Sequence, residues 1–278
     1  MMIRRMQPGD LASALKLTQA ENWSHRAEDW EFHYRIGRGW AVCDDKDALL
    51  GTATWWDYGD ALGSVGLVVV DRNQQGKGIG RQLMDTIIED AGPRALQLVA
   101  TNAGLKLYRQ CGFKESGGIE QHQGVPTLRS PVAPPSGMTL RFVTANDHAL
   151  LSDLDASAFG APRPQVIKSV LSVGTGVLAE QGGRPTGFAL MRPAGRGTTI
   201  GPVVASDEAH AIDLIAQLLN ISIGFTRIDV PADAEALAAW LDTVGLERVD
   251  RETTMVRGAR PAPRPGVRTF GLVSQALS

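Results

Sequence analysis

Three glycines at alternate positions follow a run of valines and precede an amphipathic stretch. Gly76, Gly78 and Gly80 come after Val68–Val70 and Asp71. Glycine has no Cβ, so successive backbone N–H groups in such a loop can turn inward together and form a concave anion site. A helix that begins near Gly78 adds its free N–H groups and the positive end of its dipole. This arrangement favours the binding of a ligand that carries phosphate.

The spacing of these glycines distinguishes three phosphate-binding motifs. A P-loop requires G-x-x-x-x-G-K-[ST], and the chain has no such string. A dinucleotide-binding loop requires G-x-G-x-x-G, but Arg81 stands where the third glycine belongs. The pattern [QR]-x-x-G-x-[GA] fits at every position from Gln75 to Gly80. With the valine run before it, this loop resembles the coenzyme A pyrophosphate loop of the GCN5-related N-acetyltransferases (GNAT superfamily). For the loop taken alone, an ordinary glycine-rich turn between strand and helix is the alternative.

A second motif further along the chain resembles the same superfamily. Asn102, Leu107-Tyr108 and Gly112-Phe113 follow one another in the order found there. The segment predicts a short helix from Asn102 to Gln110, with Gly112 as its capping glycine. Both motifs in this order identify residues 1 to about 120 as a GNAT domain.

The resemblance implies a role for each matching residue. In this superfamily the strand before the loop diverges from its neighbour, and its free N–H groups bind the pantetheine arm and the thioester carbonyl. Tyr108 matches the residue whose phenol protonates the leaving thiolate in many members, although packing under its helix is the alternative. The implied contacts to acetyl-CoA come from Val68, Val69, Val70, Gln75, Gly76, Lys77, Gly78, Ile79, Gly80, Arg81 and Asn102.

The general base is left open by the sequence. The candidates are Glu21, His25, His33, Asp57 and Asp60, and for each a solvated surface role is the alternative. The histidines show no metal-binding spacing such as H-E-x-x-H, so we expect no metal site.

Strands and helices alternate in an order that positions both motifs. The predicted order is a strand, two helices, three strands, the helix after the glycine loop, a strand, the helix of Tyr108 and a last strand. The resemblance implies the fold class of the GNAT superfamily, which is α/β, layered, with a mixed, mostly antiparallel central sheet flanked by helices. The expected strands cover 3–6, 39–43, 50–57, 61–70 and 96–99, and the expected helices cover 11–19, part of 20–35, 78–90 and 102–110.

The same order of elements restarts after a segment rich in proline and glycine. Residues 138–147 echo residues 2–10, and Gly245-Leu246 stands where Gly112-Phe113 stood. The sequence thus predicts two tandem GNAT folds: a catalytic domain over 1–123, a linker over 124–137 and a second domain over 138–278. We also expect a last strand over 270–277.

The second copy departs from the first where the cofactor would bind. Its strand leads directly into Ser206, Asp207 and Glu208, with no glycine loop. Two carboxylates at this position would repel a pyrophosphate. The second copy resembles the degenerate C-terminal domain of two-domain bacterial members, and we expect it not to bind coenzyme A.

Composition limits the remaining classes of function. The chain has 278 residues, a net charge of −2 and 43% hydrophobic residues, as in a soluble globular protein. Charge is balanced in both halves, which argues against a nucleic-acid partner. The sequence shows no apolar signal core and no run long enough to span a membrane. Cys43 and Cys111 are the two cysteines, which favours a reducing compartment, and the cytoplasm is the default expectation.

The expected function is transfer of an acetyl group from acetyl-CoA to a primary amine of a small molecule. Two alternatives stay open: acetylation of a protein or peptide, and a sensor that binds coenzyme A without catalysis. The second copy is expected to narrow the acceptor groove, which favours small molecules. Homodimer formation is the alternative role for that copy.

Overall fold

The computed structural model of the chain describes residues 1–127 and 137–278, which form two compact units. Unit 1 comprises Met1–Ser116, Thr254–Arg260 and Ala276–Ser278, and unit 2 comprises Gly117–Thr253 and Pro261–Gln275. Neither unit is continuous in sequence. Most of the linker expected over 124–137 lies outside the described residues. No described helix has the length and apolar character needed to cross a membrane.

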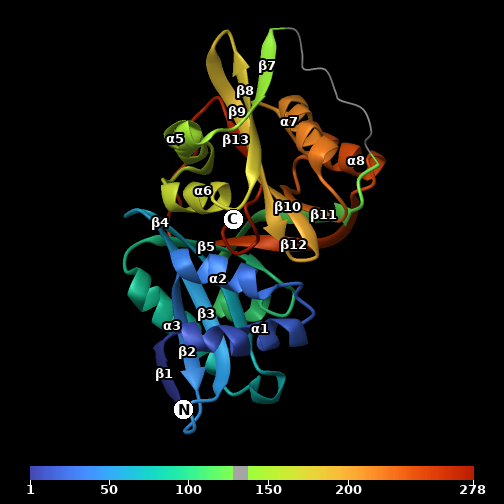
Figure 1. Cartoon of the computed structure of the whole chain (residues 1–278). Coiled ribbons are helices and arrows are strands. Elements are labelled where there is room, and N and C mark those ends of the chain that lie inside the picture. The colour runs from blue at the N-terminus through green and yellow to red at the C-terminus, as the bar shows by residue number, and fades with distance from the viewer. Residues whose placement is uncertain (128–136) are drawn as a thin grey trace. The chain divides into compact units, whose positions relative to one another are not determined.

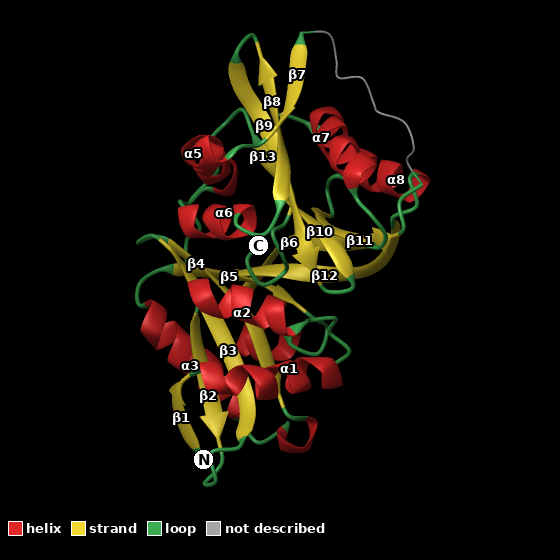
Figure 2. Cartoon of the chain, in the orientation of Figure 1, coloured by secondary structure: helices red, strands yellow, loops and turns green. Residues whose placement is uncertain are grey.

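Unit 1 is a mixed sheet with helices on both faces (Figures 1 and 2). Its strands follow the order β1-β2-β3-β4-β5, antiparallel except for the β4–β5 pair, and the end of β12 (Glu247–Arg257) continues beside β5. The strands are β1 Met2–Arg5, β2 Arg38–Cys43, β3 Leu49–Tyr58, β4 Leu62–Val70 and β5 Ala95–Ala100. The helices are η1 Pro8–Asp10, α1 Leu11–Ala20, α2 Ala27–Ile36, η2 Arg72–Gln74, α3 Ile79–Ala91 and α4 Leu105–Gln110.

Side chains of β3 and β4 alternate between the two faces of this sheet. Trp55 and its cross-strand partner Val65 belong to the core cluster that includes Leu83 of α3. Trp56 points to the opposite face, where its indole N–H donates to the carbonyl of His33 in α2 at 3.1 Å. Because partners directly opposite in a sheet share a face, Ser64 lies on the α2 face with Trp56.

Unit 2 repeats this architecture. Strands β7-β8-β9-β10 are antiparallel, β10 pairs parallel with β11, and β6 (Lys114–Gly124) pairs antiparallel with β11. The other strands are β7 Met138–Phe142, β8 Thr175–Gln181, β9 Arg184–Ala194, β10 Gly197–Ala205, β11 Thr226–Pro231 and β13 Arg268–Gly271. The helices are η3 Ala145–Asp147, α5 His148–Phe159, α6 Pro164–Leu171, α7 Glu208–Ile221 and α8 Glu235–Thr243.

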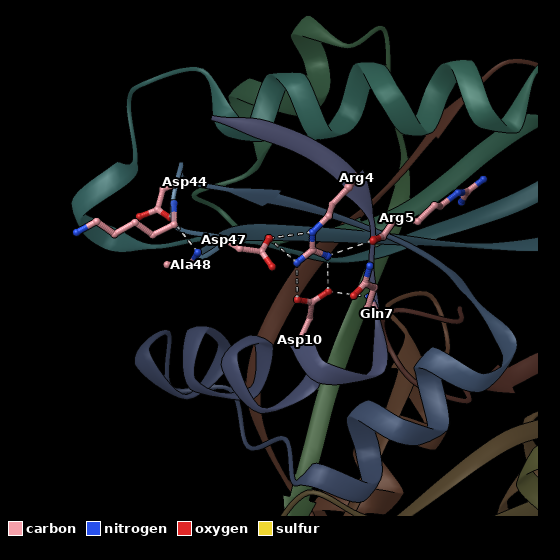
Figure 3. A network of polar contacts seen from close by, with 8 residues as sticks. Arg4, Arg5, Gln7, Asp10, Asp44, Asp47 and Ala48 are labelled. Atoms are coloured by element: carbon pink, nitrogen blue, oxygen red, sulfur yellow. Dashed lines mark hydrogen bonds and ion pairs between the residues drawn. The ribbon is translucent and has the colours of Figure 1, made fainter.

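The turn after the first strand of each repeat, β1 in unit 1 and β7 in unit 2, contains the same polar network. In unit 1 the Arg4 guanidinium donates to both oxygens of Asp10 at 2.8 and 2.9 Å, and the N–H of Gln7 donates to Asp10 at 2.7 Å (Figure 3). In unit 2 Arg141 donates to both oxygens of Asp147 at 2.9 and 2.7 Å. The N–H of Thr144 donates to Asp147 at 2.7 Å, as that of Gln7 does to Asp10.

The turn after the last helix of each repeat is also duplicated. Gly112 and Gly245 both have φ 84°. Phe113 N–H donates to the carbonyl of Tyr108 at 3.0 Å, and Leu246 N–H donates to that of Leu241 at 2.9 Å. With the polar networks, these turns confirm the tandem repeat expected from the sequence.

Candidate functional site

The glycine loop has the backbone conformation that its sequence requires. Gly76 and Gly78 have φ values of 77° and 83°, in the left-handed region that side chains with a Cβ avoid. The Gln75 side chain donates to the carbonyl of Val70 at 3.2 Å and fixes the loop to the end of β4. Gly80 is needed for packing instead, since a Cβ there would lie 3.2 Å from the Leu107 side chain of α4.

The loop leads directly into an open helix N-terminus. Gly78 is the N-cap of α3 and provides no side-chain cap, and the first turn of this described helix holds no acidic residue. The first backbone N–H groups of a helix have no partner within it, so they form a site for an anion. Ile79 anchors this end, since its side chain is buried in the core.

The two cations near the loop form contacts within the protein. Lys77 Nζ donates to the Gln74 side chain at 2.8 Å. Arg81 Nε donates to Asp85 at 2.8 Å, and its Nη1 donates to the carbonyl of Gln110 at 3.3 Å. Both side chains therefore lie beside the loop and are paired within the protein.

The strand before the loop diverges from its neighbour. Parallel pairing between β4 and β5 ends at Ser64 and Gln97. A bulge follows in β4, where Leu67 has φ 51° and its carbonyl accepts a hydrogen bond from Thr52 Oγ1 at 3.0 Å. Among the described residues, no other strand pairs with β4 on that side beyond Ser64.

The end of β4 presents backbone N–H groups to this gap. Asp71 N–H donates to the carbonyl of Leu50 on β3 at 2.8 Å. Because successive N–H groups of a strand alternate in direction, that of Val69 also points to β3, and those of Val68 and Val70 point to the gap. Val69 is buried, whereas Val68 and Val70 are half-buried. That these N–H groups hold the pantetheine arm and the thioester stays a prediction from the resemblance.

Tyr108 is held firmly in α4. It is 8% exposed, and its ring packs edge-to-face on Phe113 at a centroid distance of 6.1 Å. A Cβ at Gly104 would lie 2.6 Å from Tyr108 Cε2, so the glycine makes room for the ring. Asn102 lies exposed in the turn between β5 and α4.

The structure separates the candidates for the general base. Glu21 contacts the segment between β4 and α3, where it accepts hydrogen bonds from Arg72 at 3.0 Å and from Gln75 at 3.4 Å. Asp57 and Asp60 lie near the β3–β4 turn, where both pair with Arg94.

The two histidines lie on the α2 face of the sheet. His33 packs on Trp56 at a centroid distance of 5.6 Å, and His25 packs on His33 at 6.2 Å. Both histidines therefore lie on the face of the sheet away from α3.

In unit 2 the equivalent gap contains protein. Pairing between β10 and β11 ends at Ile200 and Ile228, and a register shift follows in β10 as in β4. Beyond it β13 pairs with β10 from Val203 to Ala205, and Leu272 N–H donates to the carbonyl of Asp229 on β11 at 2.9 Å. β13 thus pairs with β10 in the region where, in unit 1, no described strand pairs with β4 on that side.

The last strand differs from the expectation of 270–277, because pairing with β10 ends at Gly271 and the chain then leaves the strand. The final three residues belong to unit 1. Their contacts with Ser64 and Gly66 of β4 were missed by sequence reasoning. The only signal was Gly66 itself, since a glycine inside a buried strand often marks the close approach of another backbone.

Comparisons with known proteins find similarity in both repeats of the chain. A family model described as an acetyltransferase (GNAT) domain matches residues 36–115, and another with the same description matches residues 151–271. The uncharacterized N-acetyltransferase YitH of Bacillus subtilis is 28% identical over 222 residues, which are 78% of this chain and 77% of that protein.

Solved structures share the fold over the whole length. A candidate acetyltransferase from Pyrococcus horikoshii matches with a TM-score of 0.79 and 19% identity, covering 100% of this chain and 95% of that one. A tandem GNAT protein from the clavulanic acid biosynthesis pathway matches with a TM-score of 0.65 and 15% identity, covering 94% and 99%. The chain thus belongs to the GNAT acetyltransferases and carries two GNAT domains in tandem.

Proposed function

We propose that unit 1 transfers an acetyl group from acetyl-CoA to a primary amine of a small molecule. One observation carries the proposal: the gap beside Val68–Val70 leads along β4 to the open N-terminus of α3 through the glycine loop. Unit 2 has the same fold but lacks this path, since β13 lies in its gap.

The residues of the loop fit a pyrophosphate. A Cβ at Gly76 or Gly78 would meet nothing within 4 Å, so both positions face open space. The dipole of α3 favours negative charge there. Acetyl-CoA, when bound, supplies an activated thioester. The N–H groups of Val68 and Val70 would hold the pantetheine arm and polarise the thioester carbonyl, and Asn102 would hydrogen-bond near that arm.

Catalysis in this proposal divides between the two faces of the sheet. The nitrogen of a neutral amine attacks the thioester carbon, the C–N bond forms and the C–S bond breaks. Tyr108 gives its phenolic proton to the departing sulfur. His25 or His33 on the α2 face accepts the proton that the amine loses, directly or through water. Holding the reactants in line supplies much of the rate.

A small acceptor is favoured by the residues on the α2 face. Residues 276–278 pack there against β4, which narrows the approach to the reacting carbonyl. An extended protein segment needs a more open groove.

The test is release of free thiol from acetyl-CoA with a panel of amino acids, polyamines, aminoglycosides and peptides, with mass spectrometry of the products. The proposal expects a small amine to gain one acetyl group. Turnover of peptides alone would instead assign protein acetylation. Cofactor binding without an acetylated product would favour the sensor.

A further inference from the structure

The last residues of the chain are integrated into unit 1. The Ser64 hydroxyl donates to the carbonyl of Ala276 at 2.8 Å and lies 3.1 Å from the Ser278 hydroxyl. The Tyr58 hydroxyl donates to the carbonyl of Leu277 at 2.9 Å. Ser64, Tyr58 and Leu277 are each 0% exposed. Residues 276–278, named here the tail, are thus anchored by one buried and two partly buried hydrogen bonds.

The tail also packs directly on the backbone of β4. A Cβ at Gly66 would lie 2.7 Å from Ala276 Cβ and 2.8 Å from its Cα. Real Cβ atoms do not approach so closely, so any side chain at this position would displace the tail. The glycine in β4 is therefore explained by the tail that it accommodates.

This contact lies next to the proposed reacting centre. Gly66 immediately precedes Leu67, whose positive φ forms the bulge at the gap between β4 and β5. Ser64 and Gly66 pair with Trp56 and Thr54 of β3, so the tail lies on the α2 face of the sheet. Helix α3 packs on the other face.

The chemistry determines which reactant meets the tail. Tyr108, the proposed acid, belongs to the core cluster on the α3 face, so the thiolate leaves on that side. The amine adds to one face of the planar thioester carbonyl, and here it is taken to approach from the α2 face, where the tail lies. Its substituents must then fit beside Gly66 and residues 276–278.

We propose that residues 276–278 form the wall of the acceptor site and restrict it to primary amines with a slender, unbranched substituent next to the nitrogen. The proposal rests on the proposed function. It adds that the tail determines the size of the amine that unit 1 accepts. Ser64 and Tyr58 act as positioning residues, because they hold the tail and do not touch the reactants.

The test uses coenzyme A conjugates, so that the natural acceptor need not be known. In these probes the sulfur carries –CH2–CO–NH–R, with R a methyl, butyl or benzyl group. Calorimetry measures the affinity of each probe, and of coenzyme A alone, for the full-length protein. The variants are Ser64→Ala and Tyr58→Phe, which loosen different anchors of the tail. Ser116→Ala is the matched control, because the hydroxyl of Ser116 forms only a solvent-exposed hydrogen bond, with Thr254.

For wild type and the control we expect the benzyl probe to bind about tenfold or more weakly than the methyl probe, the usual cost of a group that a pocket cannot accept. In either anchor variant this ratio should fall to about threefold or less, with coenzyme A affinity unchanged. Two variants with different anchors keep the test valid if one fails to fold.

The outcomes separate the two proposals. If coenzyme A itself does not bind, the proposed function fails. If coenzyme A binds but all probes bind equally to wild type, or the ratio persists in both folded variants, the assignment of the tail as a wall is wrong.

Discussion

Tyr108 is the residue on which the proposed chemistry depends most. The phenol protonates the leaving thiolate in this account, so Tyr108→Phe should lower kcat by about 10²- to 10⁴-fold, the range for a positioned acid. KM for acetyl-CoA should change little, because the ring still packs on Phe113. Steady-state kinetics on the identified amine provides the measurement. An unchanged kcat would mean that Tyr108 only packs.

Gly104 gives an independent test of the position of that ring. Gly104→Ala keeps the phenol but places a Cβ 2.6 Å from the ring edge, so it should lower kcat by displacing Tyr108. Gly9→Ala is the control, since a Cβ there meets nothing within 4 Å. Equal kcat in both variants would argue against a catalytic position for the ring.

At the scale of elements, the first turn of each repeat depends on one carboxylate. Hydrogen bonds from Arg141 hold the pKa of Asp147 well below its usual range. A lowered pKa in the folded state stabilises the fold above the unfolded-state pKa of about 4, and the gain is lost as pH falls below that value.

Asp147→Asn should therefore lower the free energy of unfolding at pH 7 by about 1–3 kcal/mol, the combined worth of a cap and a charged hydrogen bond. The difference from wild type should shrink below pH 4. Denaturant titrations at several pH values measure it, with the exposed Asp153→Asn in α5 as control. Equal stability of the two variants at pH 7 would contradict this role.

The elements that the sequence predicted are those with a local signal. Periodicity and capping residues located the helix after the glycine loop and the helix that ends before Gly112. The placement of β13 in the gap beside β10 has no local signal, because it results from pairing between residues distant in sequence. The contact of Ala276 with Gly66 was missed for the same reason.

At the scale of the whole molecule, each unit is built from stretches that are not consecutive in the sequence. Residues 117–124 belong to unit 2, and residues 254–260 and 276–278 belong to unit 1. The domains over 1–123 and 138–278 stay a proposal. Each compact unit includes residues from before and after the segment 128–136, so we expect each unit to need both parts of the chain to fold. A fragment ending at residue 124 would lack the tail and the strand beside β5.

Cutting the chain between the repeats tests this dependence. With a protease site inserted between residues 131 and 132, the cleaved protein should still elute as one species and bind acetyl-CoA. Denaturant should separate the fragments, which serves as the control. Separation of the fragments without denaturant would show that each repeat folds alone.

The central claim is that one of the two GNAT domains binds acetyl-CoA, through the glycine loop of unit 1. Calorimetry of the full chain with acetyl-CoA tests it most directly. Gly78→Glu places a carboxylate and a strained backbone in the loop, and Gly224→Glu repeats both changes in unit 2, where the glycine has φ 80° and open space. We predict one site per chain, lost in Gly78→Glu and kept in Gly224→Glu. Two equivalent sites, or binding that survives Gly78→Glu, would contradict the account.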